Sequence, residues 1–90
     1  MVVNKKILIV DDDDEDRMLM QNIFSEIGIP DIVHYEASGE TALSYLEKLS
    51  EKELPSVIVL DLNMPKINAT QVLKLLKTNE LIKTIMVIIY

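Results

Sequence analysis

The sequence predicts an α/β protein with an open parallel sheet and helices on both of its faces. Three observations lead to this fold class. Short apolar runs of strand length alternate with longer segments in which apolar residues recur at helical spacing. Two of the apolar runs end directly on aspartates. The 90 residues are 49% hydrophobic and 27% charged, which is the composition of one ordinary globular domain.

The first strand is predicted at residues 7–10, Ile-Leu-Ile-Val, because a continuous apolar run suits a strand that is covered on both faces. Apolar residues at helical spacing follow as far as Ile27 and predict the first helix. Asp13 or Asp14 is placed to cap the start of this helix, and Gly28 is placed to end it. The chain therefore begins as strand, loop and helix.

The second strand, predicted at residues 32–35, is less apolar than the first and is expected nearer a sheet edge. A turn at residues 30–31 precedes it. Ser38 is placed to cap a second helix, whose apolar positions lie within residues 42–49. Residues 50–55 then form a polar connection. This part of the chain repeats the order of strand and helix.

The third strand, predicted at residues 57–60, runs directly into Asp61, as the first strand runs into its own aspartates. Residues 63–66 are predicted to form a loop, because Pro65 disfavours a helical conformation for the residue before it. Residues 72–76 then supply the third helix. A fourth strand is predicted at residues 85–89. This alternation indicates right-handed crossovers between parallel strands.

The formal net charge is −6, and six acids stand together at residues 11–16. Nucleic-acid binding needs clustered Lys and Arg, so we expect no direct contact with nucleic acid. No apolar run reaches the roughly 20 residues that span a bilayer, and residues 1–6 lead into a strand rather than a signal sequence. Cysteine is absent, which removes disulfides and thiol chemistry. We expect a cytoplasmic protein without membrane contact.

Asp11 and Asp12 follow the first strand, and Asp61 follows the third. In an open parallel sheet, ligands bind beyond the carboxyl ends of the strands, where the strand order reverses. If these two strands are neighbours, the three carboxylates converge and repel one another unless a cation lies between them. A cluster of oxygen ligands without His or Cys suits Mg²⁺, or Mn²⁺. A carboxylate and such a metal together allow phosphoryl transfer that ends in an acyl phosphate.

Two stretches resemble the receiver domains of two-component response regulators. They are residues 6–13, Lys-Ile-Leu-Ile-Val-Asp-Asp-Asp, and residues 57–65, Val-Ile-Val-Leu-Asp-Leu-Asn-Met-Pro. The 50 positions from Asp11 to Asp61 agree with the family's spacing. The resemblance implies a flavodoxin-like, doubly wound parallel sheet of order 2-1-3-4, with the family's fifth strand and last helices missing from this chain. Residues 1–90 would then be a receiver domain that is incomplete at its C-terminus.

The resemblance also implies roles for individual residues. Asp61 would accept the phosphoryl group from a phosphohistidine of a histidine kinase or phosphotransfer protein. Mg²⁺ would be held by Asp11, Asp12, Asp61 and the backbone carbonyl of Asn63, while Pro65 would shape the loop. Such a domain is a signalling switch that catalyses its own aspartyl phosphorylation and dephosphorylation, rather than a metabolic enzyme.

The chain departs from the family at several points. The family's Ser or Thr directly after the fourth strand and its Lys at the end of the fifth have no assigned counterpart. Lys66 and Lys83 are at the wrong positions and are interpreted as surface residues. Asn68-Ala69 stands where many receivers have Asp or Asn before Gly, so this turn has either a different backbone or some strain. The strand at 85–89 is apolar on both faces, which predicts either a longer chain or a homodimer through this edge.

Two other functional classes compete with the phosphoacceptor. One is a protein-interaction module that keeps the fold without phosphorylation, although a purely structural domain has no reason to keep three costly carboxylates. The other is an aspartyl-phosphate phosphatase or mutase, which would need a second Asp where this chain has Asn63. His34 is interpreted as a surface or partly packed residue. Residues 13–16 are interpreted as favouring the helix N-terminus rather than binding metal.

Overall fold

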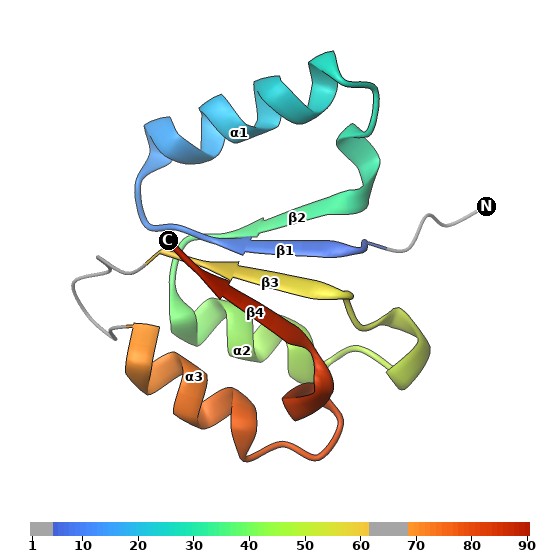
Figure 1. Ribbon diagram of the computed structural model, residues 1–90, viewed down its shortest axis with the longest axis vertical. Helices are drawn as coiled ribbons and strands as arrows, with labels where there is room; N and C mark the ends of the chain where they lie inside the picture. The colour runs from blue at the N-terminus through green and yellow to red at the C-terminus, as the bar shows by residue number, and fades with distance from the viewer. Residues whose placement is uncertain (1–4, 62–68) are drawn as a thin grey trace.

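The computed structural model describes residues 5–61 and 69–90. Within these residues a parallel sheet contains four strands in the order β2-β1-β3-β4, as Figure 1 shows. The strands are β1 (Ile7–Val10), β2 (Val33–Glu36), β3 (Val57–Leu60) and β4 (Met86–Ile89). The order and the parallel direction confirm the predicted flavodoxin-like sheet, and β2 lies at an edge as expected.

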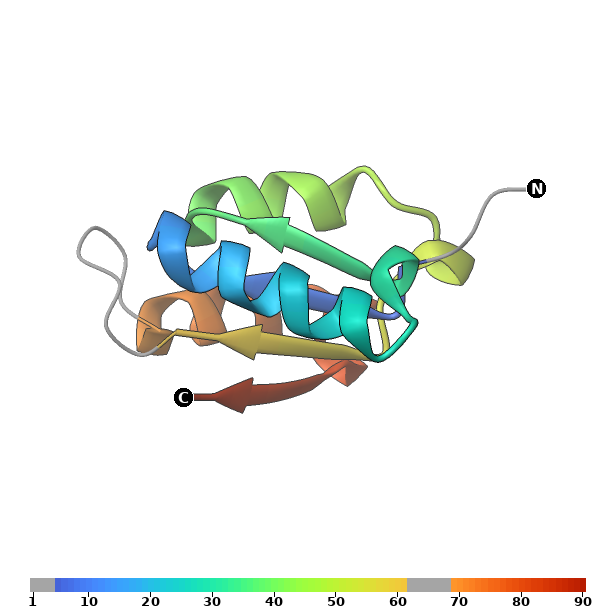
Figure 2. The same cartoon turned by 90° about the horizontal axis from the view of Figure 1, so that it is seen from above.

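Helices cover both faces of the sheet. Helix α1 (Asp14–Glu26) lies on one face, while α2 (Gly39–Glu47) and α3 (Ala69–Lys77) lie together on the other (Figures 1 and 2). The Asp13 side chain caps α1, and Ser38 caps α2 by accepting a hydrogen bond from the Thr41 N–H at 3.1 Å. Helix α2 therefore begins at the predicted cap, and α1 begins at Asp13, one of the two caps that the sequence offered.

Element boundaries differ slightly from the predicted ones because short 3₁₀ turns occupy the strand entrances. Pro30–Ile32 forms one such turn, so β2 begins at Val33. Ile82–Thr84 forms another, and β4 begins at Met86. Gly28 has a φ of 84°, a left-handed conformation that favours glycine, and it ends the α1 segment where the sequence indicated.

The strands β1 and β3 are in register over their whole length. Ile7 lies opposite Val57, and Val10 lies opposite Leu60. The two strands consequently end at the same level, and the residues that follow them, Asp11 and Asp61, emerge side by side. This register is what positions the candidate site.

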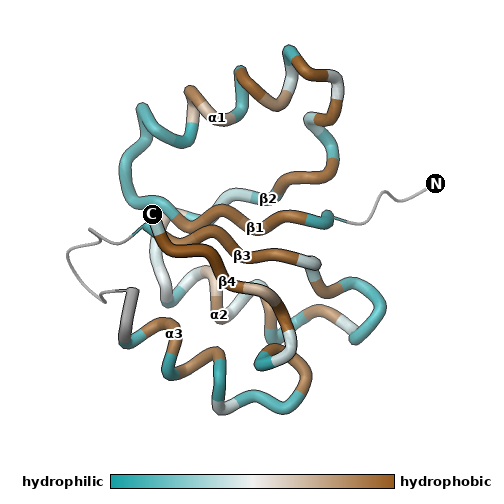
Figure 3. The backbone as a smooth tube through the Cα atoms, in the orientation of Figure 1, coloured by the Kyte–Doolittle hydropathy of each residue, from teal (hydrophilic) through white to brown (hydrophobic). Residues whose placement is uncertain are grey.

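The main core lies between the sheet and the pair α2 and α3. The side chains that are buried there come from alternate strand positions, from the two helices and from the segment that leads into β4: Leu8, Val10, Ile58, Leu60, Ala42, Leu46, Val72, Leu76, Ile82 and Ile85. Figure 3 shows the hydrophobic strands β1, β3 and β4 running side by side through the centre of the molecule. At Gly39 an added Cβ would stand 2.3 Å from Val72 Cγ2, so the close approach of α2 to α3 requires glycine.

The opposite face of the sheet is less covered. No side chain of α1 is buried, and four of its large apolar residues or those just after it are exposed: Met18, Leu19, Ile23 and Ile27. Met86 and Ile88 of β4 are exposed as well. Within residues 5–61 and 69–90, none of the helices has the length and apolar character that crossing a lipid bilayer requires.

Candidate functional site

Three carboxylates meet where β1 and β3 end. Asp11, Asp12 and Asp61 each offer one oxygen, and these oxygens all lie within 4.8 Å of one another. Asp11 is completely buried, Asp61 is half-buried and Asp12 is exposed. The structure thus brings together the three aspartates that the sequence predicted to converge.

The spacing of these oxygens fits a single hard cation. Mg²⁺ holds oxygen ligands at about 2.1 Å, so two ligands on opposite sides of the ion are roughly 4.2 Å apart. A mutual separation of no more than 4.8 Å therefore asks for only a small contraction of the cluster. The three donors found among the described residues are carboxylates, which is the chemistry that Mg²⁺ and Mn²⁺ prefer.

Asp11 is held by hydrogen bonds on every side. Its N–H donates to the Glu36 carbonyl oxygen at 3.0 Å, which ties the loop to β2. Its Oδ1 accepts from the Asp13 N–H at 2.9 Å, and its Oδ2 accepts from the Tyr90 hydroxyl. A buried carboxylate without partners would be costly, so these bonds are what allow Asp11 to sit inside the protein.

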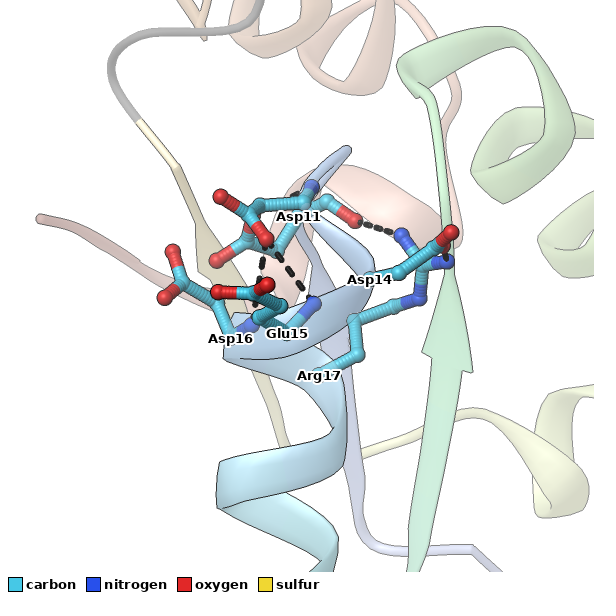
Figure 4. A network of polar contacts seen from close by, with 6 residues as sticks. Asp11, Asp14, Glu15, Asp16 and Arg17 are labelled. Carbon is cyan, nitrogen blue, oxygen red and sulfur yellow. Dashed lines mark hydrogen bonds and ion pairs between the residues drawn. The ribbon is translucent and has the colours of Figure 1, made fainter.

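Arg17 fastens the loop between β1 and α1 (Figure 4). Its Nη1 donates to the Asp11 carbonyl oxygen at 2.6 Å, and its Nη2 forms an ion pair with Asp14. Only 19% of the Arg17 side chain is exposed. Sequence analysis did not single out this residue; the available signal was a lone arginine that directly follows a run of six acids.

Asp13 belongs to the helix cap. Its Oδ1 accepts from the backbone N–H groups of Glu15 at 2.8 Å and Asp16 at 3.3 Å. Asp14, Glu15 and Asp16 form the first turn of α1, where negative charge is favourable. The interpretation of residues 13–16 as a cap is confirmed for Asp13.

The negative charges of the acidic cluster act on the carboxyl group of Asp16 as well. The pKa of its carboxyl group is raised, first by desolvation and then by the neighbouring carboxylates of Asp13, Asp11 and Asp61. The cluster is therefore a region in which negative charge accumulates without full compensation from the described residues. A bound cation would relieve this repulsion.

Tyr90 is the second residue that sequence analysis missed. It directly follows β4, its N–H donates to the Leu60 carbonyl oxygen at 2.9 Å, and its hydroxyl donates to Asp11 Oδ2. Burial, and next the hydrogen bond to Asp11, raise the pKa of the Tyr90 phenol far above its usual range. The phenol therefore stays protonated and acts as a donor.

The remaining predicted residues fall into two groups. His34 stacks on Tyr45 with ring centroids 3.7 Å apart and pairs with Glu36, so it is partly packed as expected. Ala69 is the first residue of α3. Four residues named from the sequence lie outside the described part of the chain: Asn63, Pro65, Lys66 and Asn68.

Comparison with known proteins gives a consistent result. Residues 7–90 match the family described as the response regulator receiver domain. The chain is 33% identical over 86 residues to the probable methanogenesis regulatory protein FilR2 of Methanothrix harundinacea, over 92% of this chain and 55% of that protein. It is 33% identical over 88 residues to the response regulator Rcp1 of Synechocystis sp., over 94% of this chain and 60% of that protein.

Among solved structures, the phosphorylated cyanobacterial phytochrome response regulator RcpA superposes with a TM-score of 0.78 at 32% identity. That match covers 97% of this chain and 64% of the other. The chain thus spans 55% to 60% of the length of the two curated relatives above.

The sheet order and the aspartates at its central strand ends define a flavodoxin-like α/β protein with an acidic crevice at the point where the strand order reverses. The match over residues 7–90 is more specific than the fold. This chain belongs to the response regulator receiver domain family, the receivers of two-component signalling.

Proposed function

We propose that Asp61 accepts a phosphoryl group from a phosphohistidine and that the domain acts as a signalling switch. The observation that carries this proposal is the convergence of Asp11 and Asp12 on Asp61 within 4.8 Å. This cluster lies between β1 and β3, the switch point of the sheet, where α/β proteins bind their ligands. The partner would be a histidine kinase or a phosphotransfer protein.

The metal is part of the same proposal. Asp11, Asp12 and Asp61 would hold Mg²⁺, or Mn²⁺, and the Asn63 carbonyl would be a further ligand. The metal would neutralise charge on the transferring phosphoryl oxygens. Pro65 would shape the loop that carries Asn63.

The protein's own residues would supply the nucleophile and its placement. A carboxylate oxygen of Asp61 would form the new bond to phosphorus while the bond from phosphorus to the donor histidine nitrogen breaks. The Asp61 N–H donates to the Val10 carbonyl oxygen at 2.9 Å, which fixes the nucleophile beside β1. The added charge, close to two units, would then change what the neighbouring loops bind.

Phosphorylation by a small donor tests this proposal. The chain is incubated with Mg²⁺ and acetyl phosphate, and the intact mass is measured; we expect an adduct of about 80 Da. Asp61→Asn and an excess of EDTA should each abolish it. Glu15→Gln is the matched control, because Glu15 lies in the same acidic run and is exposed. No adduct on the unmodified chain would favour the alternative, an interaction module that does not depend on phosphorylation.

A homodimer through β4 is the second part of the proposal. β4 pairs with β3 along one side, and no strand of the described residues pairs with its other side. Met86, Ile88 and Ile89 are exposed along this strand. A second copy pairing at the same edge would cover them. Light scattering should give a dimer mass, and a monomer mass at all concentrations would exclude it.

Three expectations from the sequence stay predictions. They are that residues 1–90 are an incomplete receiver domain, that the protein is cytoplasmic, and that it has no direct contact with nucleic acid.

A further inference from the structure

The Tyr90 side chain spans the acidic site. Tyr90 follows β4, Asp11 follows β1, and β3 lies between these two strands. Neighbouring strands are about 4.8 Å apart, so roughly 9.6 Å separate the ends of β4 and β1. The hydrogen bond from the Tyr90 hydroxyl to Asp11 Oδ2 therefore carries the ring across the end of β3, where Asp61 stands.

Asp11 has no exposed surface in this arrangement. Its exposed fraction is 0%, so water does not reach the carboxylate, and neither does a hydrated cation. Within residues 5–61 and 69–90, two groups hydrogen-bond the carboxylate: the Asp13 N–H on Oδ1 and the Tyr90 hydroxyl on Oδ2. The first belongs to the backbone of the same loop, and the second belongs to a side chain.

The position of the Tyr90 ring allows it to rotate away from Asp11. The residue is 44% exposed, so one side of it already contacts solvent. Its backbone is anchored to β3 through the bond from its N–H to the Leu60 carbonyl oxygen at 2.9 Å. Rotation of the side chain would therefore open the path to Asp11 without breaking the sheet.

We propose that Tyr90 gates the metal site: the closed phenol seals Asp11 Oδ2, and a divalent cation binds only when the ring turns away. The phenol proton occupies Oδ2, one of the two oxygens with which Asp11 could bind a cation, so the phenol and the cation compete for this carboxylate. This inference rests on the proposed metal site at Asp11, Asp12 and Asp61. It adds that the closed state, which the structure shows, opposes metal binding.

The first test compares Mg²⁺ affinities by isothermal titration calorimetry. Tyr90→Phe removes the competing hydroxyl and keeps the ring. The closed state then loses a hydrogen bond to a charged group, while the metal-bound state loses nothing. We therefore expect Mg²⁺ to bind at least about fivefold more tightly. Tyr90→Ala removes the cover as well and should bind at least as tightly. Tyr35→Phe is the matched control, because Tyr35 lies in β2, and its affinity should not change.

The second test observes the unsubstituted chain and uses variants only for assignment and as a control. The chain has three tyrosines, and 3-fluorotyrosine labelling gives each a ¹⁹F resonance that Tyr→Phe variants assign. Addition of Mg²⁺ should shift the Tyr90 resonance and leave those of Tyr35 and Tyr45 in place. Asp11→Asn should abolish the shift.

Each outcome decides between the two proposals. Unchanged or weaker Mg²⁺ binding in both Tyr90 variants, with circular dichroism showing that they are folded, would mean that the phenol supports Asp11 and does not gate it. An unmoved Tyr90 resonance during Mg²⁺ binding would also overturn the gate but leave the metal site intact. If the unmodified chain binds no Mg²⁺ but Tyr90→Phe does, the gate is supported. If no variant binds Mg²⁺, the metal site and the gate both fail.

Discussion

The N–H of Asp61 donates to the carbonyl oxygen of Val10 at 2.9 Å, which joins the proposed phosphoacceptor to the strand that carries Asp11. The bond continues the register of β1 and β3 by one residue beyond the strand ends. The acidic site is therefore built on the two central strands of the sheet and not on a loop alone. Residues that hold the loop after β1 should influence the metal site without touching a metal.

Arg17 is the first such residue. Arg17→Met removes the bond to the Asp11 carbonyl oxygen at 2.6 Å, and we expect it to lower the free energy of unfolding by about 1–2 kcal/mol. Mg²⁺ binding should weaken several-fold because Asp11 is less firmly placed. Urea unfolding and calorimetry measure the two effects. Lys83→Met is the matched control, since the Lys83 ion pair with Glu80 is exposed and worth at most about 0.5 kcal/mol. Equal effects of both substitutions would contradict this role for Arg17.

Asp12 and Asp13 are neighbours with different expected roles. Asp13→Ala should cost about 1 kcal/mol of stability, because the cap bonds to Glu15 and Asp16 are lost, and should change Mg²⁺ affinity little. Asp12→Ala should remove most Mg²⁺ binding and leave stability in EDTA unchanged or higher, since it lowers the local charge. Thermal unfolding and Mg²⁺ titration of both variants check the pair. Loss of metal binding in Asp13→Ala alone would reverse the two assignments.

Gly39 tests the contact between α2 and α3. An added Cβ would meet Val72 Cγ2 at 2.3 Å, so Gly39→Ala should destabilise the fold by about 1–3 kcal/mol despite the better helix propensity of alanine. Adding Val72→Ala to it should cost less than the sum of the two single substitutions, because the clash disappears. Chemical unfolding measures the cycle, with exposed Ser44→Ala as the control within about 0.5 kcal/mol. Additive single effects would show that the two residues are not in contact.

The raised pKa of Asp16 predicts that stability depends on pH. Its pKa is raised in the folded protein, so its contribution to stability is fully present below the unfolded pKa of 3.8 and is lost as the pH rises through the folded pKa. In EDTA, Asp16→Asn should therefore stabilise the protein more at pH 7 than at pH 3. Saturating Mg²⁺ should reduce the difference.

The pKa of Glu53 is shifted in the opposite direction to that of Asp16, which gives a comparison. Its pKa is lowered by the hydrogen bond from the Ser50 N–H, so its contribution to stability is present above the unfolded pKa of 4.5 and is lost as the pH falls through the folded pKa. Glu53→Ala should therefore cost more stability at pH 7 than at pH 3. Thermal unfolding between pH 3 and pH 7 measures the stability change that each substitution causes. The account would be contradicted if the two substitutions changed stability in the same direction as the pH rises.

Much of the fold follows from local patterns. The apolar runs at 7–10 and 57–60 fix the two central strands, and the aspartates that follow them reach the same sheet edge because parallel strands share one direction. Ser38, and Asp13 with Asp14 as its alternative, were recognisable as caps because their short side chains precede helical periodicity. The convergence of the carboxylates needed only the assumption that these strands are neighbours.

The contacts that close the site were not predictable in this way. The bond between Tyr90 and Asp11 joins residues 79 positions apart and depends on how a side chain crosses an intervening strand. Arg17 bonds to a backbone carbonyl, which leaves no pattern of paired residue types. The spacing of apolar residues predicted a helix at α1, but it did not show that several of these side chains would be exposed.

The most direct test of the central claim is to locate the phosphoryl group on the chain. After phosphorylation with acetyl phosphate and Mg²⁺, borohydride reduces an aspartyl phosphate to homoserine, and peptide mass spectrometry identifies the altered position. We predict homoserine at residue 61 and unchanged aspartate at residues 11 and 12. Homoserine at residue 11 or 12 with an intact Asp61, or none at any position, would contradict the account.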